Sequence, residues 1–139
     1  MDLDTCETRL LKVTTAQDIG KAIHPVLAAG QIEGGTVQGL GYALLEEVRW
    51  KDGRVWNHQL TNYIIPTAVD SPRMKVVFVD NPYSLGPRGA KGVGELPMDV
   101  AAPAVVAAIH DATGVWITEL PATPERILAA MASSRGAAA

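Results

Sequence analysis

The centre of this sequence combines a helical repeat with four glycines, and few folds accommodate both. Apolar side chains recur at spacings of three and four through residues 31–48, which predicts a helix with one buried stripe. The glycines of this segment are Gly34, Gly35, Gly39 and Gly41. Each glycine inside a helix costs about 1 kcal/mol relative to alanine. The segment therefore predicts a helix that another backbone or a ligand approaches closely.

A second glycine-rich segment, residues 81–97, is long for a connection inside a compact domain. Its four glycines and three prolines alternate with apolar side chains, which favours an ordered functional loop over a disordered one. Glu95 is the only carboxylate between Asp80 and Asp99. Because glycines let a backbone wrap closely around a site, we expect this loop to deliver Glu95 where water is scarce. Glu95 is therefore a candidate general base.

The remaining pattern predicts an α+β fold in a single domain, residues 1–139, with helices packed on one side of a mixed β-sheet. The predicted helices are residues 31–48, 100–113 and 124–132. The predicted strands are residues 9–15, 48–56 (a hairpin around Asp52-Gly53), 60–65, 74–80 and 115–120. The segments expected to lack regular structure are a loop at 16–30 and a disordered tail at 133–139.

Composition and charge exclude several classes of protein. The formal net charge is −3, and no cluster of Lys and Arg offers the basic surface that a nucleic-acid binder needs. The single cysteine, Cys6, can form neither an internal disulfide nor an iron–sulfur site. The polar, acidic start is unlike a signal peptide, and the longest apolar run, 100–109, is too short to span a bilayer. We therefore expect a cytoplasmic protein that binds neither nucleic acid nor membrane.

Two residues are candidates for ligand or substrate chemistry, and each has a plainer alternative. Gln31 is at the start of the predicted helix, where free backbone N–H groups gather, and its amide can bond a ligand or simply face water. Glu95 can instead be a surface carboxylate that is ion-paired with Lys91 or Arg88.

Two other kinds of site are not indicated by the sequence. No Walker A motif is present, because Lys91 is followed by Gly92. The three histidines lack metal-ligand spacing, so no metal is assigned to protein ligands.

Several motifs, taken in chain order, resemble one family. They begin at Asp18 (DIGKAIHP), Gln31 (QIEGGTVQGLG), Asn62 (NYIIP), Gly89 (GAKGVGELP), Asp111 (DATGV) and Leu120 (LPATPER). Together they resemble the C-terminal part of the molybdopterin-binding subunit of the xanthine dehydrogenase and aldehyde oxidase family, the molybdenum hydroxylases. The resemblance covers residues 8–132, and the motifs at Gln31 and Gly89 are specific in combination.

The resemblance implies an oxidoreductase that hydroxylates a carbon of a purine, another N-heterocycle or an aldehyde, with oxygen taken from water. It implies that Glu95 is the general base that removes the proton from the attacking oxygen. It places Gln31 on the pterin of the molybdenum cofactor and explains the neighbouring glycines, Gly34 and Gly35. It places Val93 and Gly94 beside the ligands of the metal. In this family the pterin dithiolene holds the molybdenum, which requires no protein ligand.

The resemblance also implies that the chain is not a complete enzyme, because the family's molybdenum-binding subunit is several times longer. We expect a truncated reading frame, an excised domain or a small subunit that is inactive alone. It would act with a larger molybdopterin-binding chain, with iron–sulfur clusters and FAD on other domains or subunits. One alternative is a folded remnant or assembly module that binds a partner chain without cofactor. A nucleotide-binding module that uses the glycine-rich loop is a third hypothesis.

Overall fold

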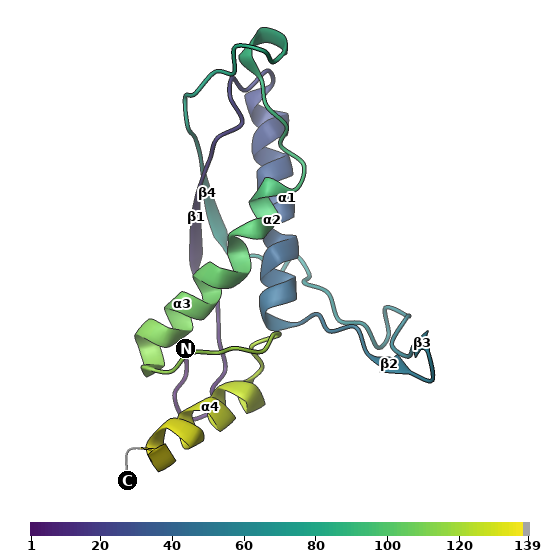
Figure 1. Ribbon diagram of the computed structural model, residues 1–139, viewed down its shortest axis with the longest axis vertical. Coiled ribbons are helices and arrows are strands. Elements are labelled where there is room, and N and C mark those ends of the chain that lie inside the picture. Colours follow the sequence, from purple (N-terminus) through teal and green to yellow (C-terminus); the bar gives the residue numbers. More distant parts are fainter. Residues whose placement is uncertain (138–139) are drawn as a thin grey trace.

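The structure is a computed structural model that describes residues 1–137 and combines helices with short strands. In chain order the elements are β1 (Lys12–Gln17), α1 (Pro25–Leu44), β2 (Trp50–Lys51), β3 (Arg54–Val55), β4 (Arg73–Phe78), η1 (Pro87–Gly89), α2 (Leu96–Asp99), α3 (Ala101–Thr113) and α4 (Pro124–Ala137). Figure 1 shows α1 running along the length of the molecule beside the β1–β4 pair. The α+β class is therefore confirmed.

Within the described residues the strands form two separate sheets of two strands each. Strands β1 and β4 run parallel, from Lys12 opposite Arg73 to Gln17 opposite Phe78. Strands β2 and β3 form the antiparallel hairpin predicted around Asp52-Gly53. Figure 1 shows this hairpin projecting from the rest of the molecule. Helix α1 contacts β4 and helix α2 contacts β1, so these helices pack against the parallel pair and not against one larger mixed sheet.

Two predicted strands, 60–65 and 115–120, are wrong, since neither segment forms a strand in the structure. The first is a turn closed by hydrogen bonds between Gln59 and Asn62, in which the Asn62 side chain accepts from the Gln59 N–H. The second buries Ile117 in the hydrophobic core between the helices. Val115 and Leu120 are partly buried against the same core, whereas Trp116 is exposed, and packing against helices does not require backbone pairing.

Helix α1 begins and ends earlier than the predicted range 31–48. His24 caps its N-terminus by accepting a hydrogen bond at Nδ1 from the N–H three residues later (3.2 Å), and Pro25 occupies the first helical position. Proline suits that position because its fixed φ is already helical and its missing N–H is not needed there. Residues 25–30 of the predicted loop 16–30 are therefore helical, and the helix ends at Leu44.

The glycines of α1 make room for the helices that pack against it, and Figure 1 shows α2 and α3 lying against α1. A Cβ on Gly35 would lie 3.0 Å from the Cβ of Pro97. A Cβ on Gly39 would lie 2.7 Å from the Cβ of Ala101. The predicted close approach is confirmed at these two positions, and the approaching group is another part of this chain.

Helix α4 completes the hydrophobic core. Its Ile127 is fully buried in one cluster with Leu40 and Ala43 of α1. The predicted last helix is confirmed, and it is longer than predicted because it continues to Ala137. The helix thus includes residues 133–137 of the predicted disordered tail, whose disorder stays a prediction, and residues 138–139 lie outside the described residues.

Candidate functional site

One carboxylate, Asp18, ties the glycine-rich segment 81–97 to the end of β1. Asp18 Oδ2 accepts hydrogen bonds from Lys91 Nζ and from Asn81 Nδ2, both at 2.7 Å. Asp18 Oδ1 accepts a third bond from the Gly20 N–H at 3.0 Å. Asp18 is the first residue after β1, so these bonds fix both ends of the stretch from Asn81 to Lys91 at one point.

Backbone hydrogen bonds reinforce this attachment. The Lys21 N–H donates to Gly89 O at 2.9 Å. The Lys91 N–H donates to Ile19 O at the same distance. Between them Gly20 has a φ of 63°, and a Cβ at this position would collide with Gly89 O. Position 20 therefore requires glycine, both for its backbone conformation and for the close approach.

The three donors stabilise the ionised form of Asp18. The hydrogen bond from Lys91 is the largest cause, followed by those from Gly20 and Asn81, and together they lower the pKa of Asp18 from 3.8 to about 2. The Asp18 and Lys91 side chains are 36% and 28% exposed, so water screens their attraction. The attachment therefore depends on directed hydrogen bonds to a carboxylate that stays ionised near neutral pH.

Glu95 lies immediately before α2, and its side chain is exposed. Its carbonyl oxygen accepts a hydrogen bond from the Met98 N–H at 3.0 Å, which begins the short helix. Lys91, one of the two partners considered for a surface ion pair with Glu95, pairs with Asp18 instead. The water-poor surroundings predicted for Glu95 are not supplied by the residues that the structure describes.

Pro97 brings the two glycine-rich motifs together. It is fully buried, and it packs on Gly35 of α1. Gly35 belongs to the motif that begins at Gln31, whereas Glu95 precedes Pro97 by two residues. The structure thus places the glycine-rich turn of α1 directly against the start of α2.

The other predicted site residues lie on the surface of the same two segments. Gln31 and Gly34 are exposed on α1, Gly94 is exposed, and Val93 is half-buried. A Cβ on Gly34 or on Gly94 would meet no heavy atom within 4 Å. Gln31 is not at the start of the helix as predicted, because α1 begins at Pro25. Its backbone N–H is therefore inside the helix, and its side-chain amide is the group that it offers to a ligand.

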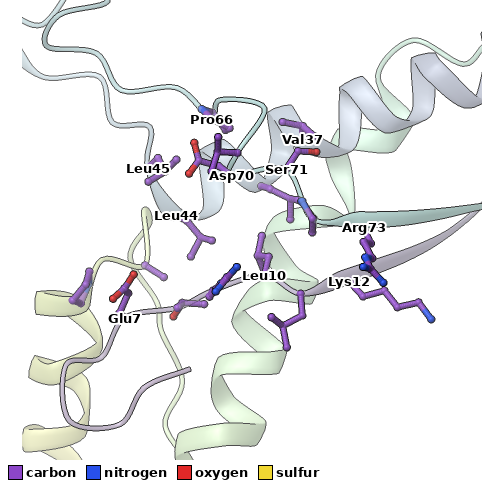
Figure 2. A pocket seen from close by; sticks show the side chains of 18 residues that line it. Glu7, Leu10, Lys12, Val37, Leu44, Leu45, Pro66, Asp70, Ser71 and Arg73 are labelled. Carbon is purple, nitrogen blue, oxygen red and sulfur yellow. The ribbon is translucent and has the colours of Figure 1, made fainter.

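A cavity of about 980 Å³ lies between the N-terminal segment, the end of α1 and residues 66–73 (Figure 2). Figure 2 shows Leu10 and Leu44 among its walls, with Lys12 and Arg73 close to each other at one end. The six predicted site residues are absent from its lining. The sequence did not predict this cavity, because it is formed by segments that are far apart along the chain.

Asp18 and Asn81 were not predicted as structural partners of the glycine-rich segment. A local signal existed for Asp18, because an Asp two residues before a Gly often bonds the glycine N–H in a turn. Its contact with Lys91 spans 73 residues, and no spacing rule indicates it.

The histidines have structural roles where their contacts are defined. His24 caps α1, and His110 stacks on Trp116 with ring centroids 4.0 Å apart. Within residues 1–137, no group of three or more His, Cys, Asp or Glu side chains is arranged to hold a metal ion. None of the helices in this part of the chain combines the length and the apolar character needed to cross a membrane.

Comparisons with known proteins agree on one family. A profile of the molybdopterin cofactor-binding domain matches residues 1–72. The chain is 38% identical over 131 residues to a probable xanthine dehydrogenase subunit of Bacillus subtilis (strain 168), a match that covers 94% of this chain and 18% of that protein.

Two solved structures share the fold. The quinoline 2-oxidoreductase of Pseudomonas putida 86 matches with a TM-score of 0.87 and 38% identity, over 95% of this chain and 17% of that one. The aldehyde oxidoreductase of Desulfovibrio gigas matches with a TM-score of 0.84 and 37% identity, over 94% of this chain and 14% of that one. The chain therefore spans less than a fifth of the length of each of these three relatives.

Proposed function

Because the chain belongs to the molybdopterin cofactor-binding domain family, we propose that it is the segment of a molybdenum hydroxylase that carries the catalytic base, Glu95. The observation that carries this proposal is the packing of buried Pro97 on Gly35. This contact sets the residues around Glu95 against the motif of Gln31, although the two motifs are far apart in the sequence. The three relatives are oxidoreductases or part of a dehydrogenase, which supports the reaction class.

The exposed groups of the two motifs suit a molybdenum cofactor that is held through its pterin. Gln31 offers an amide that both donates and accepts hydrogen bonds. The open space at Gly34 and Gly94 leaves their backbone accessible to a flat ligand. Val93 stands beside Gly94 on the same loop, and Gly35 contributes by admitting α2. We assign these five residues to cofactor binding and assign no metal ligand to the protein.

In the proposed reaction Glu95 acts as general base. When bound, the molybdenum cofactor would take up the hydrogen and the two electrons of the C–H bond that breaks at the substrate carbon. Glu95 accepts, at a carboxylate oxygen, the proton of the water-derived oxygen that attacks this carbon. Removing that proton makes the oxygen a better nucleophile as the new C–O bond forms. Because Glu95 is exposed in this chain, we expect the rest of the enzyme to cover it and to exclude bulk water.

The substrate class is a purine, another N-heterocycle or an aldehyde, which matches the range of the relatives' names. The choice among these depends on residues outside a chain that spans so little of each relative. The proposed partners are a larger molybdopterin-binding chain and subunits or domains that carry iron–sulfur clusters and FAD. The naming of relatives as subunits supports partner chains in general. A cytoplasmic location stays a prediction.

The test is Glu95→Gln in the assembled enzyme. Loss of a general base lowers turnover by about 10²-fold or more. Molybdenum content should stay unchanged, because Glu95 takes a proton and does not hold the metal. The control is Glu125→Gln, an exposed carboxylate at the start of α4, which should leave turnover unchanged. Turnover of Glu95→Gln within about tenfold of the parent would show that Glu95 is not the base.

Purification of the tagged chain from its native host, with bound chains identified and molybdenum measured, tests the alternative of an inactive fragment or assembly module. A larger chain recovered together with near-stoichiometric molybdenum supports the split or assembled enzyme. A partner chain recovered without molybdenum supports the assembly module, and recovery of neither supports a folded fragment without chemistry.

A further inference from the structure

The stretch of chain that contains Glu95 is fixed at both of its ends. At the first end Lys91 is held twice, because its Nζ bonds Asp18 Oδ2 at 2.7 Å and its N–H bonds Ile19 O at 2.9 Å. At the second end Pro97 is buried against Gly35. Glu95 lies four residues after the first fixed point and two residues before the second.

Between these two points the described residues make few contacts: Val93 is half-buried, and the Glu95 carbonyl oxygen accepts a hydrogen bond from the Met98 N–H at 3.0 Å. A Cβ on Gly92 or on Gly94 would meet no heavy atom within 4 Å, and Glu95 itself is exposed. Glycine gives the backbone more conformational freedom than any other residue. The position of Glu95 therefore depends on where the chain is fixed at Lys91 and at Pro97.

From this geometry we infer that Asp18 is a positioning residue for Glu95, an inference that rests on the proposed role of Glu95 as general base. Asp18 fixes the first end, because its carboxylate collects donors from three places in the chain: Gly20, Asn81 and Lys91. Neutralising Asp18 weakens the bonds to Lys91 and Asn81 together. A displacement of about 1 Å at a catalytic group can cost about 10²-fold in rate.

The experiment compares Asp18→Asn with the parent in the assembled, molybdenum-loaded enzyme. We expect kcat to fall by about tenfold or more, with KM and molybdenum content within about twofold, because the proton acceptor is displaced while binding groups stay in place. The matched control is Asp70→Asn. Asp70 also accepts hydrogen bonds from a neighbouring backbone N–H and hydroxyl, both of Thr67, but it lies in another loop. Its substitution should leave kcat unchanged.

Two further readouts separate positioning from general damage. In the Glu95→Gln background, Asp18→Asn should lower the rate of cofactor reduction by substrate no further, since its effect acts through Glu95. In the chain without cofactor, Asp18→Asn should speed hydrogen exchange at the Lys91 amide by about tenfold, while the Val105 amide inside α3 stays protected. An additional loss of rate in the Glu95→Gln background would overturn the inference.

A second variant, Lys91→Met, removes the other partner of the same bond and decides the question if Asp18→Asn does not fold. Lys91→Met should lower kcat by about tenfold or more, as expected for Asp18→Asn. If Glu95→Gln abolishes turnover while Asp18→Asn and Lys91→Met keep kcat within about twofold, the positioning inference fails and the proposed function stands. If Glu95→Gln itself keeps turnover within about tenfold, the proposed function fails first.

Discussion

At the residue scale, Asp18 shows how one side chain can order a loop that has almost no core of its own. Most side chains between Asn81 and Arg88 are exposed. The loop is joined to the body through the Asp18 carboxylate and the backbone of Ile19 and Lys21. Because hydrogen bonds to an ionised group are stronger than those between neutral groups, the ionisation of Asp18 matters more here than its burial.

This dependence predicts a response to acid. The pKa of Asp18 is lowered to about 2 in the folded chain, from an ordinary value of 3.8, so its carboxylate stabilises the fold above pH 3.8. That stabilisation is lost as the pH falls through about 2. We expect the melting temperature of the parent to fall more steeply than that of Asp18→Asn between about pH 5 and pH 2, as measured by circular dichroism. If the melting temperatures of the parent and of Asp18→Asn fell in parallel with pH, the fold would not stabilise the ionised form of Asp18.

At the element scale, the glycines of α1 serve two different purposes. Gly35 and Gly39 lie where α2 and α3 cross the helix, and an added Cβ would press on Pro97 or on the carbonyl oxygen of Met98. Gly30 and Gly34 face open space. All four lower the intrinsic helix propensity equally, so propensity alone cannot distinguish the packing positions from the open ones.

Two alanine substitutions distinguish the glycines that admit another helix from those that face open space. Gly39→Ala should destabilise the chain by about 1–3 kcal/mol, because its Cβ would lie 2.6 Å from Met98 O and α2 would have to move. Gly30→Ala, in open space on the same helix, should stabilise it by roughly 0.5–1 kcal/mol through helix propensity alone. Urea unfolding of both variants measures the difference. A stabilised Gly39→Ala would mean that α2 does not pack against α1 as described.

The sequence was most informative where chemistry is local. The Asp52-Gly53 hairpin, the apolar repeat of α1 and the helix start at Pro124 each depend on neighbouring residues, and each was predicted. The segment 115–120 was mistaken for a strand because periodicity reports burial without naming the partner, and Ile117 is buried among helices. For the site, the isolation of Glu95 among glycines made it a candidate, and its role stays a prediction. Its attachment through Asp18 depends on tertiary contacts that sequence spacing does not contain.

At the scale of the whole molecule, the core depends on helices from both ends of the sequence. Leu40 of α1, Ile109 of α3 and Ile127 of α4 belong to one buried cluster. The Ala122 N–H donates to Ala43 O at 2.7 Å, which joins the approach to α4 directly to α1. Helix α4 is therefore part of the core that also supports the glycine-rich face of α1.

This arrangement predicts that damage to α4 unfolds the molecule as a unit. Ile127 is 0% exposed, so Ile127→Ala should cost about 2–5 kcal/mol of unfolding free energy, because it leaves a cavity among three helices. The neighbouring Leu128 is 59% exposed, and Leu128→Ala should change stability by less than about 1 kcal/mol. Hydrogen exchange should then rise at the Ile109 and Leu40 amides in Ile127→Ala as it rises in α4. If exchange increased in α4 alone, α4 would be an independent appendage, and the face of α1 that holds Gln31 and Gly35 would not depend on it.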